Sequence, residues 1–295
     1  MTTYQSVVNA TIERLASDCE IRLASSLHDA TPKLQAAWQH QLLAKGKRLR
    51  LRLSLRTALT LGITEEQCQH LACACELVHQ ASLIHDDLMD NDRYRNNVST
   101  IWYEFGSETA ICLGDTLLVE AFFLINTIPH IDSGSMRALA TIFRNSIHAA
   151  AEGQVRDCDT NAVEHYTYTD YVDAVQRKSG ALLGLPVISA MVLQGSNKDN
   201  IVTVTEAFAE LGVVYQLLDD IEDRNIDENH RLNGYWILAK NAPKQDIYRL
   251  ATINIEKHLK LAERLLATQE ESIQNCFGYI KTLIFQKHSK LAVAS

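Results

Sequence analysis

The chain has 295 residues, of which 46% are hydrophobic and 22% are charged, which is ordinary for a globular protein with a sizeable core. Its formal net charge of −8 argues against a general nucleic-acid role, because binding to a phosphate backbone needs a basic surface. Only 4 prolines and 12 glycines are present, which disfavours an all-β fold with its many turns and favours long helices.

The remaining bulk features favour a cytoplasmic protein without a membrane span. The seven cysteines are odd in number and include no C-x-x-C pair, so we expect reduced, mostly buried thiols. The first residues include acids and no apolar h-region, which argues against a secretory signal. The longest weakly polar stretch, 180–195, is shorter than the ~20 residues that a span needs and contains a proline, so we expect a buried helix.

Helical periodicity dominates the chain from one end to the other. Thr31 and Thr64 are expected to cap helices, with Pro32 in the first turn of the earlier one. No strand alternation and no linker is visible, so we expect an all-α fold with a single domain over 1–295. The expected helices cover 4–27, 31–44, 62–90, 171–194, 201–223 and about forty amphipathic residues over 246–285. The expected loops lie near 91–100, 130–135, 158–167, 195–200 and 224–234.

Two of these helices end in the same acidic pentad. "SLIHDDLMDND" (82–92) and "YQLLDDIEDRN" (215–225) both place D-D-x-x-D at the end of a long apolar helix. Positions i, i+1 and i+4 of a helix share a face, so the three carboxylates of each pentad converge and repel one another. A hard divalent cation such as Mg²⁺ removes that conflict, since it binds one or two carboxylates together with substrate phosphates. The alternative is two solvated acidic helix ends; neighbouring His or Cys residues that would suggest zinc are lacking.

A basic segment supports the same hypothesis. "KGKRLRLRLSLR" (45–56) contains Lys47, Arg48, Arg50 and Arg52, and its ordinary interpretation is a solvated basic face. The functional interpretation is a diphosphate clamp of Lys47 and Arg50, in which arginine supplies forked donors. His79 lies two helical turns before Asp86, where a lone histidine is usually only packed in the core.

At these residues the chain resembles the trans-isoprenyl diphosphate synthase family, the head-to-tail prenyltransferases. The resemblance covers nearly the whole chain in order. It is carried by "GKRLR" (46–50), "ELVHQASLIHDDLMD" (76–90), "RNNVST" (95–100), "FGSETAICLGDTLLVEAF" (105–122), "GQVRD" (153–157), "KSG" (178–180) and "YQLLDDIED" (215–223). It implies a bundle of antiparallel helices around a deep central cavity, of the isoprenoid synthase type, and a homodimer.

The resemblance also assigns roles to residues. The metal ligands, for about three Mg²⁺ ions with the substrate diphosphate, would be Asp86, Asp90, Asp157, Asp219 and Asp223, with Asp87 and Asp220 in catalytic support. Arg95, Lys178 and Gln216 would hold the allylic diphosphate, and Lys178 would also assist catalysis. Lys47, Arg50 and His79 would hold isopentenyl diphosphate. Bound cations stabilise the diphosphate as it leaves, and the allylic cation is then attacked by isopentenyl diphosphate.

Three departures from the family pattern keep other functions open. Asn96 replaces the second arginine of R-R-G-x-P-T, Tyr235 stands where a late lysine would align, and "QKHSKLAVAS" is not an obvious family tail. An enzyme that still ionises an allylic diphosphate without elongating it, such as a terpene synthase or an unusual coupling enzyme, is one alternative. A non-catalytic partner subunit is another. In the family, bulky residues four and five positions before the first aspartate form the floor of the cavity. Here these residues are Ser82 and Ala81, so an elongating enzyme should make C20 or longer products, unless Phe122 and Phe123 close the cavity instead.

Overall fold

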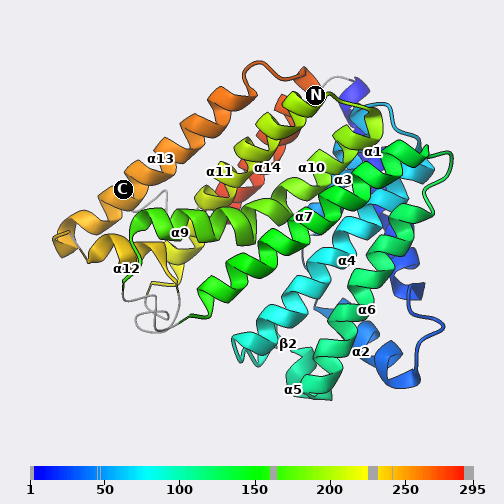
Figure 1. The fold of residues 1–295 in the computed structure, drawn as a ribbon, viewed down its shortest axis with the longest axis horizontal. Coiled ribbons are helices and arrows are strands. Elements are labelled where there is room, and N and C mark those ends of the chain that lie inside the picture. The colour runs from blue at the N-terminus through cyan, green and yellow to red at the C-terminus, as the bar shows by residue number, and fades with distance from the viewer. Residues whose placement is uncertain are drawn as a thin grey trace. The chain divides into compact units, whose positions relative to one another are not determined.

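The computed structural model describes residues 3–44, 46, 48–159, 165–224, 232–240 and 242–288 (Figure 1). Apart from one short hairpin, the regular structure in this part of the chain is helical, so the predicted all-α class is confirmed. The chain divides into two compact units. The first comprises 1–143 with 189–195, and the second comprises 144–188 with 196–295. The expectation of a single domain over 1–295 stays a prediction.

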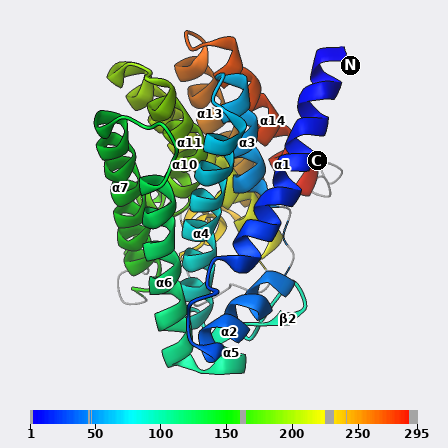
Figure 2. The same ribbon diagram turned by 90° about the vertical axis from the view of Figure 1, so that its right-hand side faces the viewer.

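The first unit is organised around α4 (Glu65–Met89), which packs against α3 (Leu49–Thr60), α6 (Ser107–Asn126) and α1 (Thr3–Ser25) (Figure 2). The helix α4 begins where predicted, because the Thr64 hydroxyl accepts from the Gln67 amide. It contains neither glycine nor proline, and fourteen of its residues are buried. The unit also contains α2 (Pro32–Leu43), α5 (Ile101–Phe105) and the beginning of α7 (Ser133–Asp157).

The second unit is organised around α11 (Lys198–Glu222), which packs against α13 (Ile247–Leu266) and against the π-helical turn η1 (Gln176–Gly180). Its other elements are the end of α7, α9 (Tyr168–Val175), α12 (Gly234–Ala239), the 3-10 turn η2 (Lys244–Asp246) and α14 (Glu271–Lys287). The helix α10 (Ala181–Gln194) contributes residues to both units. Among the described helices α11 alone is long and apolar enough to cross a membrane, but more than half of that window is buried in the protein, as in a core helix.

Several sequence expectations about elements were wrong. The segment 91–100 is not only a loop: β1 (Tyr94–Arg95) and β2 (Val98–Ser99) form an antiparallel hairpin. The helix expected over 171–194 is interrupted by the π-helical turn η1, and the one expected over 246–285 breaks into α13 and α14. Thr31 precedes α2 with Pro32 in the first turn, but its side chain makes no capping bond.

Candidate active site

The first acidic pentad lies on the last turn of α4 and the residue after it. The side chains of Asp86 and Asp90 are half-buried, and the Asp90 amide donates to the Asp86 carbonyl at 2.8 Å, so Asp90 terminates the helix. The C-terminal end of a helix carries partial negative charge, which makes carboxylates unfavourable there unless a cation is nearby. The half-buried Asp86 and Asp90 therefore present the oxygen donors that Mg²⁺ prefers, at a place that needs positive charge.

Asp87 of the same pentad differs because it is buried and paired within the chain. It is only 1% exposed, and its Oδ1 accepts from the Arg95 guanidinium at 2.6 and 2.8 Å. Burial raises the pKa of Asp87, and Arg95 opposes that rise. Arg95, predicted to hold a diphosphate, therefore pairs with Asp87 and connects the hairpin to α4.

The hairpin explains why Asn96 stands where the family has arginine. Arg95 pairs with Val98 in the ladder, so Asn96 and Asn97 form a two-residue loop. Their φ angles are 50° and 63°. Two-residue hairpin loops of type I′ need positive φ at both positions, and asparagine tolerates that conformation far better than arginine.

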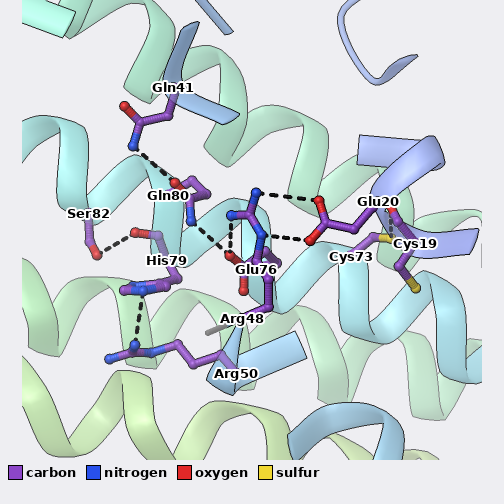
Figure 3. A network of polar contacts seen from close by, with 10 residues as sticks. All are labelled: Cys19, Glu20, Gln41, Arg48, Arg50, Cys73, Glu76, His79, Gln80 and Ser82. Atoms are coloured by element: carbon purple, nitrogen blue, oxygen red, sulfur yellow. Dashed lines mark hydrogen bonds and ion pairs between the residues drawn. The ribbon is translucent and has the colours of Figure 1, made fainter. Parts of the chain in front are cut away.

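Arg50 and His79, two of the three residues that the resemblance assigns to isopentenyl diphosphate, are in contact (Figure 3). The Arg50 guanidinium donates to His79 Nε2 at 3.0 Å, so the proton of a neutral His79 lies on Nδ1. Burial, together with Arg50, Arg95 and Arg48, holds the pKa of His79 well below its usual value. The buried Nδ1 has no hydrogen-bond partner among the described residues and is a donor that a ligand oxygen could use. Lys47, the other member of the proposed clamp, lies outside the described residues.

Arg48, from the same basic segment, forms ion pairs within the first unit. Its guanidinium binds Glu20 at 2.8 Å and the buried Glu76 at 2.9 Å, and Gln80 donates to the same Glu76 oxygen (Figure 3). Arg48 has a positive φ of 46° and immediately precedes α3. The pairing with Glu76 therefore fixes the start of the helix that carries Arg50. A buried charge without its partner is costly, so this network favours one backbone path into α3.

In the second unit, three glycines let α7, η1 and α11 approach closely. A Cβ on Gly153 would lie 2.5 Å from the Lys178 amide, and one on Gly212 would lie 2.5 Å from Gly180 Cα. This approach brings together Asp157 at the end of α7, Lys178 on η1 and Gln216 on α11. Lys178 forms an ion pair with Asp157, and all three residues line one pocket. The remaining lining residues are Gly153, Ala174, Val175 and Leu232.

Both carboxylate oxygens of Asp220, in the second pentad, accept hydrogen bonds from within the chain. One carboxylate oxygen accepts from the Tyr171 hydroxyl and the Gly234 amide, both at 2.7 Å, and the other accepts from Gln216 at 3.0 Å. Burial raises the pKa of Asp220 to about 7, against the opposing effect of these donors. Asp220 therefore anchors the start of α12 and orients Gln216, and its supporting role in catalysis stays a prediction.

Asp219 and Asp223 repeat the geometry of Asp86 and Asp90. Asp223 follows α11 directly, and its amide donates to the Asp219 carbonyl at 2.9 Å. Asp219 is half-buried and accepts from Lys287 Nζ at 2.6 Å. The buried His288 places Nε2 3.2 Å from Asp219 and Nδ1 3.1 Å from Glu222.

The sequence analysis missed Lys287 and His288, because they lie 68 and 69 positions after Asp219, on a different helix end. The argument that no histidine accompanies the acids is therefore wrong for the second pentad. The only available signal was the basic pair "KH" at the end of a long amphipathic helix. Lys287 of this pair also places a cation beside the second pentad.

Comparisons with known proteins agree with this arrangement. The polyprenyl synthetase family profile matches residues 31–232. A short chain isoprenyl diphosphate synthase of Methanocaldococcus jannaschii is 32% identical over 87% of this chain and 79% of its own length. A farnesyl diphosphate synthase of Bacillus subtilis is 32% identical over 81% of this chain and 83% of its own length. A geranylgeranyl pyrophosphate synthase of Geoglobus acetivorans is 33% identical over 64% of this chain, and the chain spans 59% of that relative.

Solved structures support the same fold. A geranylgeranyl pyrophosphate synthetase structure from Geoglobus acetivorans matches with a TM-score of 0.79 and 24% identity, over 92% of this chain and 99% of that chain. The predicted enzyme class, trans-prenyltransferase, is the class of the relatives named here. The profile covers more than half of the chain, and the predicted resemblance is confirmed: the chain belongs to the polyprenyl synthetase family.

Proposed function

We propose that this chain is a Mg²⁺-dependent prenyltransferase that condenses an allylic prenyl diphosphate with isopentenyl diphosphate, head to tail. The observation that carries the proposal is the repeated placement of two half-buried or exposed aspartates at the C-terminal end of a core helix: Asp86 with Asp90, and Asp219 with Asp223. Bound there, Mg²⁺ would supply Lewis-acid stabilisation of the departing diphosphate. About three ions, with Asp157 as a further ligand, are part of the proposal.

The chain's own residues have distinct parts in this reaction. Lys178 and Gln216 line one pocket with Asp157 and would orient the allylic diphosphate. Arg95 would exchange its bond to Asp87 for a diphosphate oxygen. Arg50 and the Nδ1–H of His79 would hold isopentenyl diphosphate, with Lys47 expected to assist. Removal of the C–H proton from the condensed cation would fall to the released diphosphate, since His79 already directs Nε2 at Arg50.

Two alternatives have specific support. Asn96 removes a family cation from the hairpin, which would suit an enzyme that ionises an allylic diphosphate without elongating it, such as a terpene synthase. The Arg50–His79 pair favours elongation, because an enzyme without isopentenyl diphosphate has no use for it. A non-catalytic partner subunit would show no Mg²⁺-dependent turnover alone and activity only with a second chain.

Product length, assembly and location complete the proposal. Ala81 is buried, the Ser82 hydroxyl donates to the His79 carbonyl, and both side chains are small, so we propose a product of C20 or longer. A homodimer in the cytoplasm is proposed from family membership.

Product analysis of the purified protein tests the reaction. The assay supplies Mg²⁺ and C5, C10, C15 or C20 allylic diphosphates, each with and without isopentenyl diphosphate. Longer prenyl diphosphates that form only with isopentenyl diphosphate would support elongation. A hydrocarbon or alcohol formed from an allylic diphosphate alone would replace the proposal with a terpene synthase, and no turnover would favour the partner subunit.

A further inference from the structure

The end of α14 brings a histidine to the second acidic pentad. His288 is 2% exposed, and its ring lies between the carboxylates of Asp219 and Glu222, 3.2 and 3.1 Å from its two nitrogens. Neither nitrogen makes a hydrogen bond with any residue that the structure describes. The two contacts are ion pairs only when the ring is protonated. A neutral ring instead offers one nitrogen to a metal ion and keeps the other as an N–H donor.

A metal ion is the partner that this donor set fits. Each of three residues, Asp219, Glu222 and His288, offers one ligand atom, and these three atoms lie within 4.8 Å of one another. Ligands about 2 Å from a common ion can be separated by up to about 4 Å, so small side-chain adjustments would place all three on one ion. Imidazole with carboxylates suits Zn²⁺, Co²⁺ or Mn²⁺, whereas Mg²⁺ prefers oxygen donors and retains its waters.

We propose that Asp219, Glu222 and His288 form a mixed nitrogen–oxygen site for a divalent transition-type cation, for which Zn²⁺ and Mn²⁺ are suitable probes. The site shares Asp219 with the proposed Mg²⁺ centre and rests on the proposed function only in that respect. It makes the two acidic pentads unequal, because the first offers oxygen donors and the second adds an imidazole.

Lys287 is the natural competitor for this site. Its ammonium lies 2.6 Å from Asp219 and 2.9 Å from the Tyr215 hydroxyl. It supplies positive charge to Asp219 when no ion is bound, and a divalent cation must share that carboxylate with it or displace it. Substitution of Lys287 and substitution of His288 should consequently change cation affinity in opposite directions.

Pulsed EPR of the full chain loaded with Mn²⁺, without substrates, tests the site. A directly coordinated imidazole produces nitrogen coupling to Mn²⁺, which carboxylates cannot produce. We expect this coupling in the wild type and its loss in His288→Gln. His85→Gln is the matched control, since His85 precedes Asp86 and faces Asp115 at 3.8 Å; it should retain the coupling. No coupling in the wild type, or coupling that survives in His288→Gln, would overturn the proposal.

Calorimetric titration with Zn²⁺ gives a second readout. The affinity should fall at least about tenfold in His288→Gln and Glu222→Gln, and should rise in Lys287→Gln. An all-oxygen site would instead leave His288→Gln unchanged, which contradicts the proposal. If His288→Gln fails to fold, the nitrogen coupling in the wild-type spectrum and the Zn²⁺ affinity of Glu222→Gln still test the site. Both measurements omit substrates, so their outcome is separate from whether the chain elongates prenyl diphosphates.

Discussion

Among single residues, His79 is kept neutral by its burial and by the arginines near it. Arg50 donates to its Nε2, and burial with three nearby arginines holds its pKa well below the ordinary value. A neutral imidazole is thus a permanent feature of the folded chain, and the arginines carry the positive charge. The unpaired Nδ1–H is then a neutral donor for a ligand oxygen.

This environment predicts a pH effect on stability. The unfolded chain protonates His79 near its ordinary pKa of about 6.5, whereas the folded chain keeps it neutral to lower pH. The unfolded state therefore binds more protons as pH falls below about 6.5, and the free energy of unfolding decreases. When urea denaturation is measured from about pH 7.5 to about pH 5, the free energy of unfolding should fall less in His79→Gln than in the wild type.

The matched control is His148→Gln, because His148 is an exposed histidine whose Nε2 lies 3.6 Å from Glu152. Its pH profile should follow that of the wild type. Parallel profiles for His79→Gln and the wild type would show that His79 is not held neutral.

The resemblance assigned Asp157 to a metal ion, and Lys178 and Gln216 to the allylic diphosphate. The structure brings these three residues to one pocket, and their roles stay predictions. Spacing within a helix also predicted that Asp86 and Asp90 share a turn. The partners of these acids could not be predicted, because the contacts Arg95–Asp87 and His288–Asp219 depend on the hairpin and on the end of α14.

Among the elements of the second unit, close helix approach positions Asp157, Lys178 and Gln216. Gly153 faces the backbone of η1, where a methyl group would meet Lys178 N at 2.5 Å and Ala174 O at 2.8 Å. Neither atom belongs to a flexible side-chain end. The turn η1 is π-helical, and such turns frequently mark functional sites in helices that are otherwise α-helical. A periodic apolar pattern cannot reveal one extra residue in a turn, which is why one uninterrupted helix was expected over 171–194.

Gly153→Ala should therefore destabilise the fold by about 1–3 kcal/mol and lower turnover, because η1 must move and carry Lys178 with it. The control is Gly278→Ala in α14, where no atom lies within 4 Å of the added methyl group. That substitution should be neutral or stabilising by up to about 1 kcal/mol. Thermal or urea unfolding measures the change in stability for both variants. Equal changes would mean that the close approach at Gly153 does not constrain the helices.

The hairpin gives a second prediction for an element. Asn96→Val should cost about 1–2 kcal/mol, because a β-branched residue is strained at the φ of 50° found there. Asn96→Gly keeps the turn conformation and should stay within about 0.5 kcal/mol of the wild type. Comparison of the two by urea denaturation separates backbone strain from loss of the asparagine side chain. A stable Asn96→Val variant would refute the two-residue turn.

For the whole molecule, the all-α class and most helices could be predicted from the sequence, since Pro and Gly are scarce and apolar periodicity is continuous. The hairpin was missed because two-residue strands contain no alternation to detect. The break at 267–270 was missed because the amphipathic pattern continues through "TQEE" without glycine or proline. Both features follow from contacts between elements rather than from local propensity.

Product length is a property of the whole molecule that one residue should control. Ala81→Phe would put a ring on the buried face of α4, five positions before Asp86, and should shift the product mixture to shorter prenyl diphosphates. Overpacking should also cost about 1–3 kcal/mol, so helicity must be measured beside the products. An unchanged product distribution from a folded variant would remove Ala81 as a determinant of length.

Both acidic pentads are proposed to bind the metal ions that drive ionisation of an allylic diphosphate. The most direct test is the Mg²⁺-dependent initial rate of Asp86→Ala and Asp219→Ala beside the wild type, with circular dichroism as the folding check. Asp199→Ala is the control, because Asp199 is an exposed acid in the first turn of α11. We expect each pentad variant to lose at least about 100- to 1,000-fold in rate with an unchanged helical signal, while Asp199→Ala keeps its activity. Wild-type rates in either Asp86→Ala or Asp219→Ala would contradict the account.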